Sequence, residues 1–335
     1  MRLATWNVEW FDALFDDAGH PLADAAPSGR FGVTREEQLG AIAEVLRALD
    51  ADAVLIIEAP DISRHRDGRA ALARFASRAG IRACSALAGF PSETQQEILL
   101  LHDPAVLKAE HAPSRLGAPR FDGRWRIDLD LDGLPEPVTF SKPPLEAVLS
   151  GFGRSLRFIG VHAKSKAPYG AAGPADATRI AIENRRKQLA QCLWLRARVS
   201  AHLAEGESLV VAGDFNDGPG LDAYEALFGR SGVEVLMGAG EPGPLFDPHA
   251  AGLHPATTAR FRSGPAGPGA GPGEGPAFGP VEALLDFILV SEDLRATGPR
   301  WRVWNPFEDE ALAGDAGLAA ALVAASDHFP VTLDL

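Results

Sequence analysis

Short apolar runs that stop at a carboxylate, an amide or an imidazole recur along the whole chain and constrain its fold more than any other feature. A buried strand that ends in this way delivers a polar side chain to the rim of a sheet. The residues at these run ends are Asn7, Glu58, His162, Asp214, Asn216, Asp286, Asp327 and His328. They offer oxygen ligands and two imidazoles but no cysteine, which predicts a hard-metal site assembled from many strands.

The chain has 335 residues and is 46% hydrophobic, enough for one large core or for a two-layer fold doubled on itself. It contains no apolar run of about 20 residues, the length needed to span a membrane. The first run starts at Arg2, and because Asn7 is already a candidate ligand we expect no signal peptide. The two cysteines, Cys84 and Cys192, predict no disulfide framework and make the cytoplasm the default location.

The net charge is −13, from 45 acidic and 32 basic residues. A tight, sequence-independent grip on nucleic acid requires a basic surface that neutralises phosphates, so this charge argues against it. The charge does not exclude an enzyme that brings a divalent metal to a phosphate and releases its product quickly.

The order of predicted elements is mixed rather than a strict alternation of strands and helices. Thr34 and Glu37 form a capping box that opens a helix, and further helices are expected at 68–79 and 176–203. Strand-like runs lie at about 2–8, 52–58, 81–87, 97–102, 125–131, 137–149, 155–162, 208–213, 282–290 and 328–334. This order predicts an α/β (α+β) sandwich of two sheets with helices outside. The Gly/Pro tract 264–280 is expected to be a flexible loop within one domain that spans 1–335.

The motifs around these residues resemble the endonuclease/exonuclease/phosphatase superfamily, also called DNase I-like, over nearly the whole chain. In the family's order they are TWNVEWF with Asn7, AVLIIEAPD with Glu58, GVHAKSK with His162, GDFNDGP with Asp214 and Asn216, LLDFILVS with Asp286, and SDHFPV with Asp327 and His328. The family commonly has Gln before that Glu, where this chain has Ile57. The resemblance implies a four-layer αββα sandwich of two mainly antiparallel sheets, nearest to the deoxyribonuclease-like branch.

The resemblance also implies a role for each residue. The expected ligands of Mg²⁺ or Mn²⁺ are Glu58, as the primary ligand, with Asn7 and Asp327. Asp214 and Asn216 are expected to orient water or phosphate, or to hold a second ion. His328 backed by Asp286 is the expected general base, and His162 assists from the opposite side of the phosphate. The two imidazoles should give a bell-shaped pH dependence, and their roles as acid and base can be exchanged.

Three lysines and one amide are candidate substrate contacts. The segment TFSKPPLEAVL resembles the strand that carries a phosphate-contacting Arg in deoxyribonuclease-type members, and Lys142 stands in that place. Asn216 and Lys164 are further candidates, while Lys164 and Lys166 can equally be solvated loop residues. Gln96 and Glu97 compete for the position that orients His162.

Each residue alone has an ordinary structural explanation. Asn7 suits a turn or cap, His162 a core histidine, and the segment from Asp214 to Pro219 a tight turn. Their joint occurrence in the family's order favours a magnesium-dependent phosphoester hydrolase. The leading function is a phosphodiesterase or endonuclease acting on DNA or RNA, because His162 and the SKPP segment look deoxyribonuclease-like.

Two alternatives remain open. The acidic surface favours a small-molecule or phospholipid phosphatase or phosphodiesterase. A non-catalytic binding member of the family is the alternative from another class, and the intact residue set argues against it. The sequence implies neither a membrane span nor a protein partner.

Overall fold

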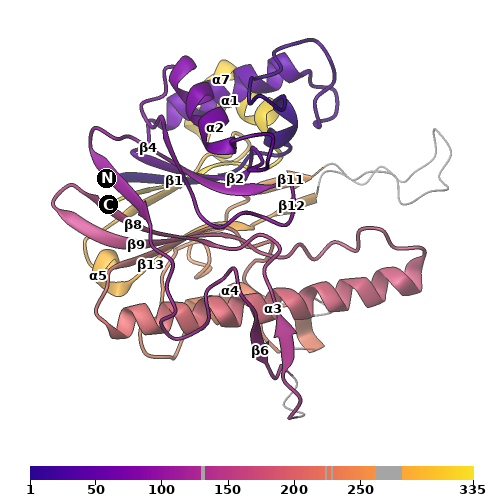
Figure 1. Cartoon of the computed structure of the whole chain (residues 1–335), viewed down its shortest axis with the longest axis vertical. Helices are drawn as coiled ribbons and strands as arrows, with labels where there is room; N and C mark the ends of the chain where they lie inside the picture. The colour runs from indigo at the N-terminus through magenta and orange to yellow at the C-terminus, as the bar shows by residue number, and fades with distance from the viewer. Residues whose placement is uncertain (130–132, 223–224, 228, 262–280) are drawn as a thin grey trace.

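Two β-sheets stacked face to face form the centre of the chain, and helices cover their outer faces (Figure 1). The computed structural model describes residues 1–129, 133–222, 225–227, 229–261 and 281–335. The first sheet has the strand order β14-β15-β1-β2-β4-β3, and the second has the order β13-β10-β9-β8-β5. The predicted αββα sandwich is therefore confirmed.

Each sheet is mainly antiparallel with one parallel pair, β1–β2 in the first and β9–β10 in the second. The strands of the first sheet are β1 (Arg2–Asn7), β2 (Ala53–Ala59), β3 (Ser85–Ala88), β4 (Glu97–His102), β14 (Arg300–Val303) and β15 (Val331–Asp334). Those of the second are β5 (Leu107–His111), β8 (Leu145–Gly151), β9 (Arg154–His162), β10 (Leu209–Asp214) and β13 (Asp286–Val290). Two small ladders, β6 (Trp125–Ile127) with β7 (Glu136–Val138) and β11 (Ala259–Phe261) with β12 (Val281–Ala283), lie outside them.

The central strands are apolar on both faces because each sheet is covered on both sides. In β2, Val54 and Ile56 pack in the cluster beneath the helices, whereas Leu55 and Ile57 pack against the opposite sheet. Strands buried on both faces read as continuous apolar runs rather than as alternating ones. The long runs that end at polar residues are the sequence signature of this double burial.

Helices form the two outer layers. Figure 1 shows α1 (Arg35–Leu49), α2 (Gly68–Arg78) and α7 (Ala316–Ala325) on the first sheet, and α3 (Pro174–Ala204) with α4 (Gly232–Met237) along the second. The Thr34 side chain accepts from Glu37 N, and the Glu37 carboxylate caps Thr34 N in return, so the predicted capping box is confirmed. The short helices are η1 (Phe11–Leu14), η2 (Glu225–Leu227), α5 (Glu292–Arg295) and α6 (Glu310–Ala313).

Several expected strand limits are wrong. The run 137–149 is broken between β7 and β8, where Pro143 and Pro144 supply no backbone donor for a ladder. The run 282–290 contains two strands, separated where Thr258 Oγ1 accepts from the backbone nitrogens of Leu285 and Asp286. Sequence reasoning missed α7, because its AGLAAALVAA sequence has no polar face and so no helical periodicity.

The tract 264–280 lies outside the described residues, and the single domain spanning 1–335 stays a prediction. On either side of that tract, Phe261 pairs with Val281 across the β11–β12 ladder. In the part of the chain that the structure describes, no helix is long and apolar enough to cross a membrane.

Candidate active site

The ends of five strands, drawn from both sheets, meet at one place. In the second sheet, Asp214 ends β10 beside His162 of β9 and opposite Asp286 of β13. In the first sheet, Asn7 ends β1 beside Ile57, one residue before Glu58. Asn7 Nδ2 donates to Asp214 Oδ2 at 3.0 Å, so a direct hydrogen bond joins the two sheets at this point.

His328 is buried against Asp286. Its Nδ1 lies 2.8 Å from Asp286 Oδ2, the arrangement expected from the sequence. The loop that carries it is held by Ser326, whose Oγ accepts from His328 N and Glu9 N and donates to Asn7 O. Burial opposes protonation of His328, but the surrounding carboxylates, first that of Asp286, outweigh it and raise its pKa to about 10.

His162 lies beside Lys142 and Asp214. Lys142 Nζ is 3.0 Å from His162 Nε2 and donates to Gln96 Oε1 at 3.2 Å, while Asp214 Oδ2 lies 3.7 Å from His162 Nε2. Burial, together with the positive charges of Lys142 and His328, holds the pKa of His162 well below its usual range. Burial likewise lowers the pKa of Lys142 to about 8. The pKa values of the two site histidines are therefore shifted in opposite directions.

Neither residue proposed to orient His162 contacts it directly. Gln96 reaches it through Lys142. Glu97 points elsewhere, and its carboxylate accepts from the backbone nitrogens of Ser92 and Ile62. Within the described residues, His162 Nδ1 is buried without a hydrogen-bond partner.

Glu58 and Asp327 complete the acidic side of the site. Glu58 Oε2 accepts from Trp10 N at 3.1 Å, and burial raises the pKa of Glu58. Burial also raises the pKa of Asp327 to about 7, and the carboxylates of Glu9 and Glu58 add to that shift. The Glu58 carboxylate is thus one of the charges that raise the pKa of Asp327.

Backbone strain gathers at this site. Glu58, Asn216 and Trp10 have φ angles of 62°, 50° and 58°, in the left-handed region that favours glycine. At Glu58 the strain coincides with a register shift in the β2–β4 ladder. Such strain persists only where the surrounding structure enforces it, and it often marks functional positions.

The loop that carries Asn216 is held by Asp214 and by helix α3. Asn216 N donates to Asp214 Oδ1 at 2.8 Å, and its Nδ2 donates to Ala163 O and Asp214 Oδ2 at 3.2 Å each. Gln188 Nε2 donates to the backbone oxygens of Lys164, Phe215 and Asn216. The backbone of the predicted phosphate contact Lys164 is thereby tied to α3, and its half-buried side chain lies near enough to Lys142 to influence its charge.

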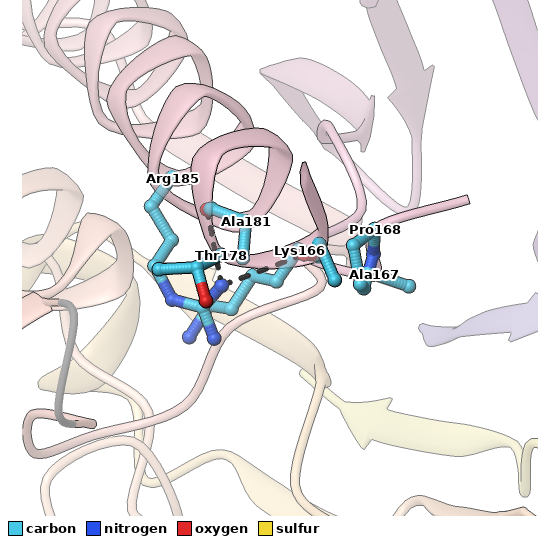
Figure 2. Close-up of a pocket in the computed structure, with 7 residues that line it drawn as sticks. Lys166, Ala167, Pro168, Thr178, Ala181 and Arg185 are labelled. Carbon is cyan, nitrogen blue, oxygen red and sulfur yellow. Dashed lines mark hydrogen bonds between the residues drawn. The ribbon is translucent and has the colours of Figure 1, made fainter. Parts of the chain in front are cut away.

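Lys166 is neither a free phosphate contact nor a solvated loop residue. Its Nζ is paired with the carboxylates of Asp217 and Glu225 beneath the loop. Lys166 and Arg185 line a cavity of about 310 Å³ between α3 and the loop after β9 (Figure 2). Arg185 is paired with Asp222. Because carboxylates neutralise both cations, we assign this cavity no part in phosphate binding.

The donor atoms at the site fit a divalent cation. In the described part of the chain, Asn7 Oδ1 and Asp286 Oδ1 are buried oxygens without a hydrogen-bond partner. Asp214, Asp286 and His328 can bring one ligand atom each within 4.8 Å of one another. Oxygen-rich sets of this kind suit hard cations. The predicted ligands Glu58 and Asp327 are outside this group of three, and their ligand roles stay predictions.

Three positioning residues could not be recognised from the sequence. Ser326 looks like the first letter of the SDH motif, Thr258 stands apart from any motif, and Gln188 lies in a helix that contains none of the motifs. The sequence signal for Gln188 is a pair of glutamines, Gln188 and Gln191, three residues apart in an otherwise apolar helix stretch. Gln191 Oε1 accepts from Lys164 N, so both amides serve the site loops.

The sandwich and its paired strand ends define a protein of DNase I-like architecture. A model of the Endonuclease/Exonuclease/phosphatase family matches residues 4–328, and the chain belongs to that family. The family generally consists of metal-dependent phosphoester hydrolases.

Several solved structures are similar to this chain at low sequence identity. Truncated TDP2 from Caenorhabditis elegans has a TM-score of 0.53 and 14% identity, covering 99% of this chain and 96% of that chain. A family protein from Bacteroides thetaiotaomicron has a TM-score of 0.48 and 12% identity, covering 100% and 98%. The human Nocturnin catalytic domain with bound sulfate anion has a TM-score of 0.46 and 16% identity, covering 100% and 93%. A search of curated proteins finds no match.

Proposed function

We propose that this protein is a phosphodiesterase that requires Mg²⁺ or Mn²⁺ and acts on nucleic acid. The observation that supports this most is the position of two histidines around Asp214. His162 lies with Lys142 on one side of Asp214, and His328 lies with Asp286 on the other. A phosphate bound between them would have an imidazole on each side, an arrangement that suits general acid–base catalysis of an in-line displacement. A bound divalent cation supplies charge neutralisation at the non-bridging oxygens.

The roles follow from position. Glu58, Asn7 and Asp327 are proposed to hold the cation, and Asp214 with Asn216 to orient water or phosphate. Lys142, already in contact with His162, is proposed to bind a phosphate oxygen, with Lys164 beside it. His328, backed by Asp286, and His162 exchange protons with the attacking water and the leaving oxygen.

The charge of the site favours a diester over a monoester. Four buried or half-buried carboxylates, Glu58, Asp214, Asp286 and Asp327, surround it, and Lys142 is the lysine in direct contact with it. A monoester carries up to two negative charges and therefore needs more neutralisation from the bound cation and Lys142 than a diester, which carries one. The resemblance of the His162 and SKPP segments to deoxyribonucleases supports nucleic acid as the diester.

A substrate panel tests the proposal. Wild type and His328→Ala are assayed with Mg²⁺ and Mn²⁺ on plasmid DNA, RNA, a single-stranded oligonucleotide, bis-para-nitrophenyl phosphate, para-nitrophenyl phosphate and sphingomyelin. We expect cleavage of nucleic acid and of the synthetic diester, little turnover of the monoester, and loss of both activities in the variant. Preference for sphingomyelin or the monoester would replace nucleic acid with a small ester. Folded protein inert on the whole panel would favour a binding role.

A further inference from the structure

Trp10 stands directly beside the candidate metal ligand Glu58. Its backbone nitrogen donates to Glu58 Oε2 at 3.1 Å, three residues after Asn7. Its side chain is nevertheless 50% exposed, although Trp6 on the same segment is fully buried. A large aromatic ring is therefore presented to solvent at the edge of the site.

The protein holds this ring in place at a conformational cost. Trp10 has φ 58° and ψ 26°, a left-handed conformation that is rare for an aromatic residue. A Cβ added at Gly29 would lie 2.4 Å from Trp10 Cγ, so the Gly29 backbone packs closely against the indole. Arg30, the next residue, is paired with Glu9 and donates to Val323 O, which anchors this loop to the segment after β1 and to helix α7. The indole therefore has one supported side and one open side.

We infer that Trp10 is a stacking residue for an unpaired nucleobase next to the scissile phosphate. The inference rests on the proposed function and narrows its substrate to single-stranded or unpaired nucleotides. An exposed, immobilised indole binds any base through its π face, and such stacking needs no basic groove. It thus supplies affinity that a chain of net charge −13 does not obtain from phosphate neutralisation.

The chain offers a matched control at Phe152. This aromatic residue is also half exposed, at 52%, and also left-handed, with φ 53°. It lies in the β8–β9 turn, whereas His162 is at the other end of β9. Phe152→Ala removes the same kind of side chain from the same backbone conformation, away from the site.

The experiment compares two 12-residue strands with equal phosphate charge. One is oligothymidylate, and the other consists of tetrahydrofuran residues that lack bases. The value of kcat/KM with Mg²⁺ is measured for wild type, Trp10→Ala, Trp10→Phe, Gly29→Ala and Phe152→Ala. Quenching of intrinsic tryptophan fluorescence by oligothymidylate in EDTA reports contact without turnover.

We expect Trp10→Ala to lower kcat/KM on oligothymidylate by about 5- to 100-fold, the usual effect of losing one base stack, mainly through KM. Its effect on the base-free strand should stay below about twofold, since no stack is lost there. Trp10→Phe should recover most of the loss, and Gly29→Ala should reproduce part of it by displacing the ring. Phe152→Ala should match wild type, and Trp10→Ala should lose part of the fluorescence quenching.

Three results would overturn the inference, each in a different way. Equal loss on both strands would show that Trp10 acts through the Glu58 backbone contact. Unchanged cleavage of oligothymidylate by Trp10→Ala would remove the stacking role and leave the proposed function standing. Wild-type protein that cleaves no nucleic acid, yet hydrolyses another phosphoester, would end the proposed function together with the inference.

Discussion

At the scale of single residues, His328 and Asp286 form the most specific feature of the site, with 2.8 Å between His328 Nδ1 and Asp286 Oδ2. We predict that His328→Ala lowers kcat by about two to four orders of magnitude, the usual contribution of general acid–base catalysis. Asp286→Asn should lower kcat to a similar extent. The double variant should lower kcat little more than His328→Ala alone, since the effects of groups that act as one unit are not additive. Steady-state kinetics on a diester measures these effects.

A second histidine–carboxylate pair provides the control for this series. His249 Nδ1 lies 3.4 Å from Asp247 Oδ1, outside the site, so His249→Ala should keep near-normal turnover. Folded His328→Ala with the turnover of wild type would remove the catalytic assignment.

Glu97, a buried carboxylate near the site, is expected to make the free energy of unfolding depend on pH. It is 2% exposed, and burial, with repulsion from Asp61 and Asp12, raises its pKa to about 7. The folded state thus binds the Glu97 proton more tightly than the unfolded state does. The contribution of Glu97 to the free energy of unfolding therefore declines by about 1–3 kcal/mol between about pH 4.5 and pH 7. Glu97→Gln should keep the hydrogen bonds from Ser92 and Ile62 but remove that decline.

Urea unfolding at pH 5 and pH 8 measures the effect of Glu97. Relative to wild type, Glu97→Gln should gain about 1–3 kcal/mol of unfolding free energy on going from pH 5 to pH 8. Glu146 is the contrasting case, because it is bound to the buried Arg198 at 2.6 Å and its replacement by Gln should destabilise at both pH values. A constant difference between Glu97→Gln and wild type would contradict the assignment.

At the scale of elements, helix α3 connects the outer layer to the catalytic loops. Gln188→Met removes the donor to three backbone oxygens, including that of Asn216, and we expect it to cost about 1–3 kcal/mol of stability. Because Asn216 loses part of its support, turnover per folded molecule should also fall. The matched variant Gln191→Met loses bonds to Lys164 N and Thr139 O, so it should cost similar stability with less effect on turnover. Equal turnover in the two variants would show that Gln188 supports only the fold.

Some elements can be predicted from the sequence, whereas others cannot. Strand runs such as 52–58 are apolar on both faces and predict β2 well, and the run end at Asp214 predicts a site residue. Long-range hydrogen bonds cannot be predicted in this way. Ser326, Thr258 and Gln188 support the site only through bonds to segments far away in the sequence. Helix α7 shows a further limit, because an unbroken apolar stretch has no period by which helix and strand can be told apart.

At the scale of the whole molecule, two stacked sheets bring Asn7 and Glu58 from one side and Asp214, Asp286 and His162 from the other to one place, which we propose to be a cation site. The fold is shared with truncated TDP2 from Caenorhabditis elegans at 14% identity. Because one fold can host many functions, we look for substrate choice in residues at the rim, such as the proposed stacking residue Trp10, rather than in the sandwich.

A Mg²⁺ titration of metal-stripped protein, read out as cleavage of a single-stranded oligonucleotide, tests whether the residues at the strand ends bind a cation that cleavage requires. Wild type should be inactive in EDTA and recover fully with Mg²⁺. Glu58→Gln should need at least about tenfold more Mg²⁺ for half-maximal activity, because it removes a charge that binds the cation. His328→Ala should need the same Mg²⁺ as wild type but reach a much lower plateau. Full turnover of stripped wild type in EDTA, or an unchanged Mg²⁺ requirement in Glu58→Gln, would contradict the account.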